Sequence, residues 1–146
     1  MIKKTFDEAI LYGGSVQVDY IPPAEWADEI IDHLIDIFPE LEDEINKEIY
    51  YNFSAHLVFD MILFPQVMEW AENNQTEKLK KLSDLLEEML LSTDNICIPN
   101  VVEVSFLETL VLEDGDIISK LKPYFHTKTL KSLQYWMNRY GKQSEK

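Results

Sequence analysis

The sequence contains few residues that cross-link a chain or interrupt its secondary structure. It contains a single cysteine, Cys97, so no disulfide can form within the chain. Four glycines and six prolines among 146 residues provide few turn signals, which argues against an all-β fold built from hairpins. No run of about 20 apolar residues occurs, so we expect no helix that crosses a membrane.

The first residues also lack the pattern of a secretion signal. Asp7 and Glu8 precede any long apolar run, whereas a signal peptide places a basic stretch directly before an apolar one. Together with the single cysteine, this predicts a cytoplasmic protein with no membrane partner.

Basic residues are scarce and unevenly placed. The chain holds 27 acidic and 13 basic residues, which gives a formal net charge of −14. Residues 7–119 contain 26 of the acids and four lysines, whereas residues 120–146 contain seven basic residues and one acid. Proteins that bind nucleic acid neutralise phosphates with a basic face, so no nucleic-acid partner is expected. An acidic body favours a basic protein partner, because complementary charge accelerates association.

The sequence is rich in apolar residues that recur at helical spacing. Hydrophobic residues make up 46% of the chain, an ordinary share for a globular domain. Their recurrence at every third or fourth position predicts helices near 23–38, 40–51, 55–73, 77–92, 100–112 and 127–140. A short helix ending near Leu121 and another near 4–12 are also expected.

Several of these helices carry more detailed predictions. The helix near 55–73 is apolar nearly all round, which is typical of a central helix. Trp70 and most of residues 57–68 are therefore expected to be buried, and Pro65 predicts a kink or a break within the helix. Thr76 is the predicted cap of the helix near 77–92. Two apolar stripes are expected to be buried: Trp26, Ile30, Leu34 and Ile37 in the first helix, and Val101, Val104, Leu107 and Leu110 in the fifth.

Together these elements predict an all-α fold. We expect one helical domain, residues 1–146, in which six or seven helices form a bundle or a short stack. Residues 1–22 are expected to be irregular, with room for a short extended segment near 16–20, and residues 141–146 to form a frayed tail. These patterns do not determine the oligomeric state.

An acidic stripe on the first predicted helix, continued into the second, is the strongest candidate for a functional surface. We call it the acidic ridge: Glu25, Asp28, Glu29, Asp32, Asp36, Glu40, Asp43 and Glu44. Residues 25–48 contain ten acids and one lysine, and like charges at helical spacing repel by about a few tenths of a kcal/mol per pair. The ridge is either a solvated outer face or a docking surface for a basic partner.

No catalytic, cofactor or metal site is expected. His56 and Asp60 are four residues apart, but no third ligand lies at a recognised spacing. Cys97 lies between two isoleucines, the setting of a buried cysteine that behaves as a small hydrophobe. No phosphate-binding loop or nucleophile motif occurs, so the protein is not expected to be an enzyme.

The last predicted helix is basic and aromatic. It combines Lys128, Lys131 and Arg139 with Tyr135 and Trp136, a mixture that can mark RNA binding. The interpretation we favour is structural: Trp136 packs inward, and the basic residues compensate the acidic body.

Part of the chain resembles a group of small, poorly characterised bacterial helical proteins. This resemblance covers residues 82–125 and rests on Leu-Leu-Glu-Glu at 85–88, Asn-Val-Val-Glu-Val-Ser-Phe-Leu-Glu at 100–108 and Leu-Lys-Pro-Tyr at 121–124. Taken whole, the chain also resembles the immunity proteins of bacterial toxin–immunity pairs. Those proteins are often small, acidic and cytosolic, and many neutralise basic nuclease toxins. The resemblance implies tight binding to one cognate toxin domain, but it assigns no binding residues.

Two functions follow as expectations. In the first, the acidic ridge binds and neutralises a cognate basic toxin, a nuclease domain, by standing in for the phosphates of its substrate. The alternative is a helical adaptor or scaffold protein that binds a basic peptide or helix.

Overall fold

The computed structural model describes residues 25–48, 55–93, 95–113 and 115–142, and every regular element in these ranges is helical. The predicted all-α fold is therefore confirmed. The elements expected near 4–12 and 16–20 lie outside the described residues. None of the described helices is long and apolar enough to cross a membrane. The chain divides into two compact units, residues 1–58 and 59–146, and each is considered by itself.

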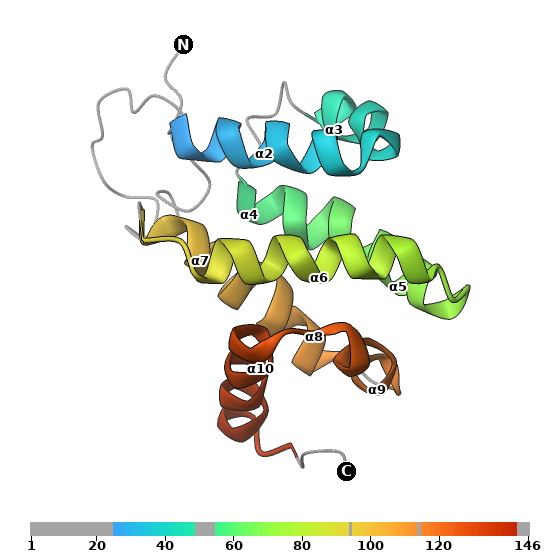
Figure 1. Ribbon diagram of the computed structural model, residues 1–146, viewed down its shortest axis with the longest axis vertical. Helices are drawn as coiled ribbons and strands as arrows, with labels where there is room; N and C mark the ends of the chain where they lie inside the picture. Colours follow the sequence, from blue (N-terminus) through green and yellow to red (C-terminus); the bar gives the residue numbers. More distant parts are fainter. Residues whose placement is uncertain (1–24, 49–54, 94, 114, 143–146) are drawn as a thin grey trace, which may run out of the picture. The chain divides into compact units, whose positions relative to one another are not determined.

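The first unit is built around one amphipathic helix. Its described elements are α2 (Glu25–Ile37), η1 (Pro39–Leu41), α3 (Glu42–Glu48) and α4 (Ala55–Leu57) (Figure 1). Leu34 and Phe38 are almost completely buried, and α2 packs against α4. Burial of one such side chain stabilises the fold by about 1.5–3 kcal/mol. The predicted apolar stripe is confirmed at Ile30 and Leu34, whereas Trp26 and Ile37 remain partly exposed.

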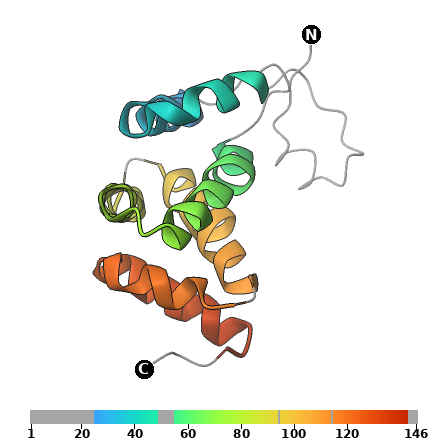
Figure 2. The same ribbon diagram turned by 90° about the vertical axis from the view of Figure 1, so that its right-hand side faces the viewer.

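The second unit contains the remaining helices. They are η3 (Val58–Leu63, which begins at the last residue of the first unit), α5 (Phe64–Glu72), α6 (Thr76–Leu90), α7 (Cys97–Val102), η4 (Glu103–Glu108), α8 (Thr109–Leu112), α9 (Ile117–Leu121), η5 (Lys122–Tyr124) and α10 (Thr127–Arg139). Figures 1 and 2 show that α10 runs across the direction of α6, with which it is in contact.

The helix around Pro65 changes type instead of breaking. The π-helical segment η3 ends at Leu63, and Pro65 follows in the first turn of α5. The chain is helical on both sides of this change, and Pro65 has no backbone N–H to donate to the preceding turn. Half of residues 57–68, which were expected to be mostly buried, are buried: Val58, Phe59, Ile62, Leu63, Phe64 and Val67. Met61 is 57% exposed, and Asp60 is also exposed. Trp70, in contrast, is buried.

Helix α6 has the core that its sequence predicts. The six apolar residues at helical spacing are all buried: Leu79, Leu82, Leu85, Leu86, Met89 and Leu90. The predicted cap is off by one residue, since Gln75 precedes the helix and Thr76 is its first residue. The Thr76 hydroxyl donates to the Asn74 carbonyl oxygen at 3.4 Å, so it serves the preceding turn. Asn74 has a φ of 55°, which a turn requires and asparagine tolerates.

The fifth predicted helix is interrupted by a second π-helical segment, η4. A π-turn contains an extra residue, so side chains that follow it rotate relative to an α-helix. Three residues of the predicted stripe are buried as expected: Val101, Leu107 and Leu110. Val104, inside the π-helical segment, is 39% exposed, and its neighbours Ser105 and Phe106 are buried. The Phe106 ring meets Phe64 of α5 edge-on, with ring centroids 5.6 Å apart.

Candidate functional site

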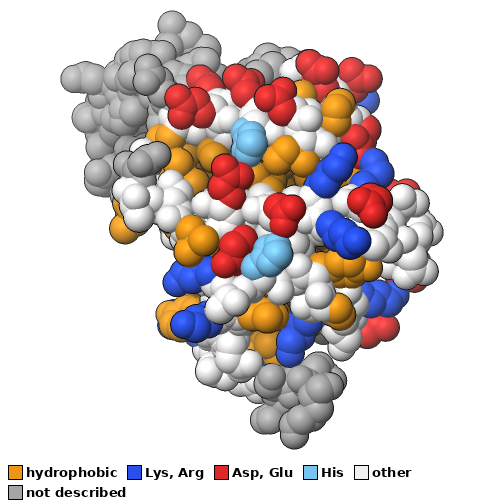
Figure 3. Space-filling model, in the orientation of Figure 1, with side chains coloured by type: hydrophobic (Ala, Val, Ile, Leu, Met, Phe, Trp, Pro, Cys, Tyr) orange, Lys and Arg blue, Asp and Glu red, His pale blue; other side chains and the backbone are white. Residues whose placement is uncertain are grey.

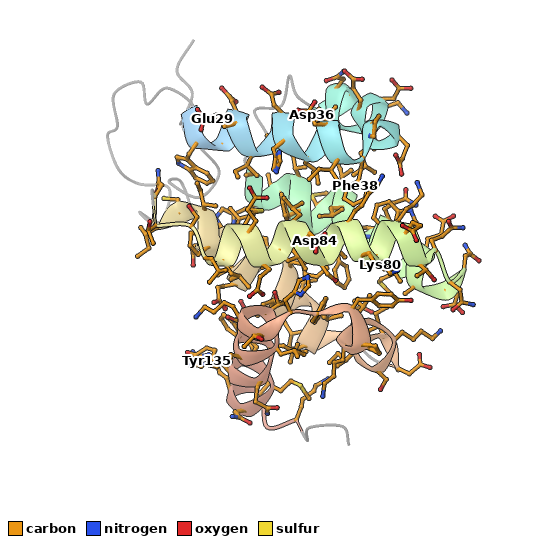
Figure 4. The ribbon with its side chains drawn as sticks, viewed as in Figure 1. Glu29, Asp36, Phe38, Lys80, Asp84 and Tyr135 are labelled. Atoms are coloured by element: carbon orange, nitrogen blue, oxygen red, sulfur yellow. The ribbon has the colours of Figure 1, made fainter. Side chains whose placement is uncertain are left out.

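The acidic ridge lies on the solvent side of the first unit. Its seven members with described side chains are exposed: Asp28, Glu29, Asp32, Asp36, Glu40, Asp43 and Glu44. The side chain of Glu25 is outside the described residues. Figure 3 shows carboxylates gathered over α2 and α3, and Figure 4 shows Glu29 and Asp36 projecting from the same side of α2. The predicted surface is therefore present as a continuous feature of these helices.

Most ridge carboxylates on α2 have no partner among the described residues. Asp28, Glu29 and Asp32 form neither a hydrogen bond nor an ion pair there, and the same holds for Asp36. On α3, Lys47 lies 3.6 Å from Glu44, with both side chains more than half exposed. Such an exposed pair contributes only about 0–1 kcal/mol. The ridge is consequently a concentrated negative surface with little internal neutralisation.

A second group of carboxylates, in the second unit, has a different role. Glu87 of α6 accepts hydrogen bonds from the backbone N–H groups of Lys128 (3.0 Å) and Thr129 (2.9 Å), and from the Thr129 hydroxyl (2.8 Å). The first N–H groups of a helix have no partner within it, so Glu87 satisfies donors at the start of α10. Asp84 lies 2.8 Å from the imidazole Nε2 of His126, the residue directly before this helix.

Two further carboxylates hold the rest of α10. Glu103 accepts hydrogen bonds from the Ser132 hydroxyl (2.7 Å) and the Trp136 indole N–H (2.9 Å). Glu108 accepts one from the Tyr140 hydroxyl, which raises the pKa of that tyrosine. We call this group the α10 anchor: Asp84, Glu87, Glu103 and Glu108. It joins α6 and η4 to α10 by hydrogen bonds along the whole length of α10.

The structure shows how the aromatic and basic side chains of the last helix lie. Trp136 does turn inward, toward Glu103, although its side chain is only partly buried. Neither Lys128 nor Lys131 forms a side-chain ion pair with a described residue. Glu87 and Glu103 accept hydrogen bonds from neutral donors of α10.

The electrostatics of Glu87 reflect its contacts. Desolvation by itself raises the pKa of Glu87, but hydrogen bonds from Thr129 and Lys128, together with the positive charge of His126, lower it further than desolvation raises it. The net result is a pKa below the usual value for glutamate. Glu87 is therefore held in its charged form, which is the form that accepts three hydrogen bonds.

Two shallow depressions border α10. One, of about 400 Å³, is lined by Asp84, Glu87, Glu88, Leu91, His126 and Thr127. The other, of about 420 Å³, is lined by Asn100, Glu103, Lys128, Lys131, Ser132, Tyr135 and Trp136. In the second depression the Ser132 hydroxyl donates a hydrogen bond to the Glu103 carboxylate.

The sequence pointed to two further places for chemistry, the His56–Asp60 pair and Cys97. No three His, Cys, Asp or Glu side chains in the described part of the chain are placed to hold a metal ion together. Cys97 is half-buried at the start of α7, where its backbone N–H donates to the Asn95 side chain at 2.9 Å. Asp60, four residues after His56, accepts a hydrogen bond from the Thr109 hydroxyl at 3.4 Å.

The sequence predictions did not include the α10 anchor. One signal could have indicated it: α10 begins with no acidic residue in its first turn and has no side-chain cap of its own. Its first N–H groups therefore require acceptors from elsewhere in the fold. The sequence does not show which of the many carboxylates supplies them.

Comparison with known proteins places the chain in a family without an assigned activity. A family model described as "Domain of unknown function (DUF7674)" matches residues 31–141, which extend from α2 to just beyond α10. The match includes the α10 anchor and most of the ridge, but it starts after Asp28 and Glu29. No curated protein and no solved structure matches the chain.

Proposed function

The chain belongs to the family described as "Domain of unknown function (DUF7674)", and since that family assigns no activity, we propose from the structure that the acidic ridge binds a basic protein. We propose further that this partner is a toxin, a nuclease domain whose basic substrate groove the ridge occupies, so that the chain acts as its immunity protein. The toxin assignment comes from the resemblance described above, whereas the ridge provides the chemistry.

One observation carries this proposal: four neighbouring carboxylates of α2 are exposed and have no partner among the described residues. Asp28, Asp32 and Asp36 are four residues apart, so their carboxylates recur about every 6 Å along one side of the helix. Keeping like charges this close costs stability. A basic partner would turn that cost into binding energy, because it would supply the missing counter-charges.

The ridge would act first on the rate of encounter. A surface of one charge steers an oppositely charged partner, and it can raise association rates by about 10–1,000-fold. Retention of the partner requires apolar contacts as well.

The test is a capture experiment with two charge-matched variants. The ridge variant carries Asp28→Lys, Asp32→Lys and Asp36→Lys. The control carries Glu72→Lys, Glu77→Lys and Asp116→Lys in the second unit, where these side chains are 76%, 83% and 77% exposed. Each triple variant moves the formal net charge from −14 to −8, because each reversal adds two charges.

We expect the parent and the control to capture the same basic protein from the native host, and the ridge variant to lose it. Co-expression then tests neutralisation: the parent and the control should protect cells from the captured protein, and the ridge variant should not. Equal capture by all three proteins would contradict the ridge as the binding surface. Capture of a short basic peptide or helix, with no toxic partner, would favour the adaptor function through the same surface.

A further inference from the structure

The shallow depression between α10 and η4 has properties that neither the ridge nor the α10 anchor uses. Lys128, Lys131 and Tyr135 are separated by three and four residues, so they lie on one side of α10. The lysines are exposed, and Tyr135 is 56% exposed. Figure 3 shows basic and hydrophobic side chains adjacent over α10, and Figure 4 shows Tyr135 projecting outward from this helix.

The two ammonium groups are available to an anion. The chain has twice as many acids as bases, yet neither Lys128 nor Lys131 forms an ion pair with a described residue. Glu87 and Glu103, which contact α10, accept hydrogen bonds from its neutral donors. An anion placed between these lysines would receive two positive charges and would displace no existing ion pair.

The aromatic side of the depression is held in place. The Trp136 indole N–H donates to Glu103, and the Trp136 ring stacks on Tyr140 with centroids 6.4 Å apart and an interplanar angle of 21°. Tyr135 meets Trp136 edge-on, with centroids 5.2 Å apart. Fixed aromatic rings beside lysines are the combination with which proteins stack a base and neutralise its phosphate.

The backbone offers a separate indication. Glu103, which lines the depression, is the first residue of the π-helical segment η4. Such segments are rare and frequently occur at functional sites. Here the π-turn lies directly beside the lysines and the aromatic rings.

We infer that this depression binds a free nucleotide. Its phosphate lies between Lys128 and Lys131, and its base packs against Tyr135 and Trp136. The volume of about 420 Å³ is within the usual range for small-molecule sites, about 300–1,000 Å³. A long nucleic-acid strand is disfavoured by the net charge of −14, which repels a polyanion more strongly than a single phosphate. The negative charge of Glu103 repels the phosphate from the side of the depression where Glu103 lies. The same carboxylate can accept hydrogen bonds, so it favours a base with N–H donors.

Nuclear magnetic resonance of the indole N–H groups tests this inference, because the chain has three tryptophans and only Trp136 lines the depression. Addition of adenosine monophosphate should shift the Trp136 signal in a saturable manner and leave the signals of Trp26 and Trp70 in place. The double variant Lys128→Gln/Lys131→Gln should bind about tenfold more weakly, the loss expected when two charge-assisted contacts are removed. Tyr135→Ala should weaken binding as well.

The matched control is Lys80→Gln/Lys81→Gln on α6, which removes the same charge from exposed positions outside the depression (Figure 4). This control should bind like the parent, and so should the ridge variant, which separates this site from the proposed function. Circular dichroism checks that each variant is folded, and the single variants Lys128→Gln and Lys131→Gln replace the double one if it is not.

Three results would overturn the inference. The first is no shift of the Trp136 signal at millimolar adenosine monophosphate. The second is equal affinity for inorganic phosphate or for adenosine, which would show that one half of the nucleotide is not recognised. The third is much tighter binding of single-stranded oligoadenylate, which would identify a nucleic-acid strand, and not a free nucleotide, as the occupant.

Discussion

The carboxylates of the two units differ in what they contact, although both units are acidic. On α2, Asp28, Asp32 and Asp36 extend into solvent without a partner among the described residues. In the second unit, Glu87 and Glu103 each accept hydrogen bonds from α10. The comparison teaches that net charge says little about function by itself. The informative quantity is the number of carboxylates that form no hydrogen bond or ion pair within the folded chain.

The physical reason lies in where donors are placed. The start of α10 presents backbone N–H groups that its own helix cannot satisfy, and Glu87 lies close enough to accept them. The ridge carboxylates of α2 lie opposite its buried residues, so no helix end or hydroxyl faces them in the described first unit. A carboxylate without an internal donor contributes to the long-range field, which is the property that a basic partner detects.

The largest expected effect is on binding by the ridge. The ridge variant should bind the captured partner with an association rate constant at least about tenfold lower than that of the parent. The reason is that its weaker negative field steers a basic partner less effectively. The parent's own rate should fall with salt, since the screening length shrinks from about 10 Å at 0.1 M to about 3 Å at 1 M. Stopped-flow association kinetics at several salt concentrations measure both. Equal rates for parent and ridge variant at low salt would remove the functional distinction between the two groups of carboxylates.

The next effect concerns stability and sharpens the same comparison. Glu87→Ala should lower the free energy of unfolding by about 1–2 kcal/mol, because it leaves donors of α10 without their acceptor. Asp28→Ala, the matched change on the ridge, should leave it within about 0.5 kcal/mol of the parent. Urea denaturation of the three proteins provides the values. Similar losses for both variants would mean that ridge carboxylates also stabilise the fold.

A third prediction concerns pH. The pKa of Glu87 is lowered in the folded chain, so its contribution to stability is full above the pKa of an unfolded glutamate, about 4.3, and is lost as the pH falls through the lower folded value. Glu87→Gln should therefore lose less stability than the parent between about pH 5 and pH 3. Thermal unfolding across this range, with Asp28→Asn as the control, tests the prediction. Parallel curves for parent and Glu87→Gln would contradict it.

The smallest effect is expected from relieving repulsion on the ridge. Asp32→Asn removes one charge from between Asp28 and Asp36, so stability should rise by about a few tenths of a kcal/mol. Because the repulsion is screened, the gain should shrink at high salt. Precise calorimetry at low and high salt is needed. A clear loss of stability would show that Asp32 has a structural partner.

The sequence by itself determined the helical architecture and much of the core. Local spacing places Leu79, Leu82 and Leu86 on one side of a helix, and no other element is needed to predict their burial. The exposure of Asp28 and Asp36 follows from the same periodicity. These features depend on 3.6 residues per turn, a property of each helix alone.

Only the tertiary structure decided which positions depart from that regular spacing and which acids find partners. Val104 lies within the π-helical segment η4 and is exposed, whereas Leu107 and Leu110 are buried as α-helical spacing predicts. Glu87 and Glu103 became anchors because residues about 41 and 29 positions later in the chain bring their donors to them. Spacing along one helix cannot reveal such pairs, since each hydrogen bond depends on where two separate helices meet.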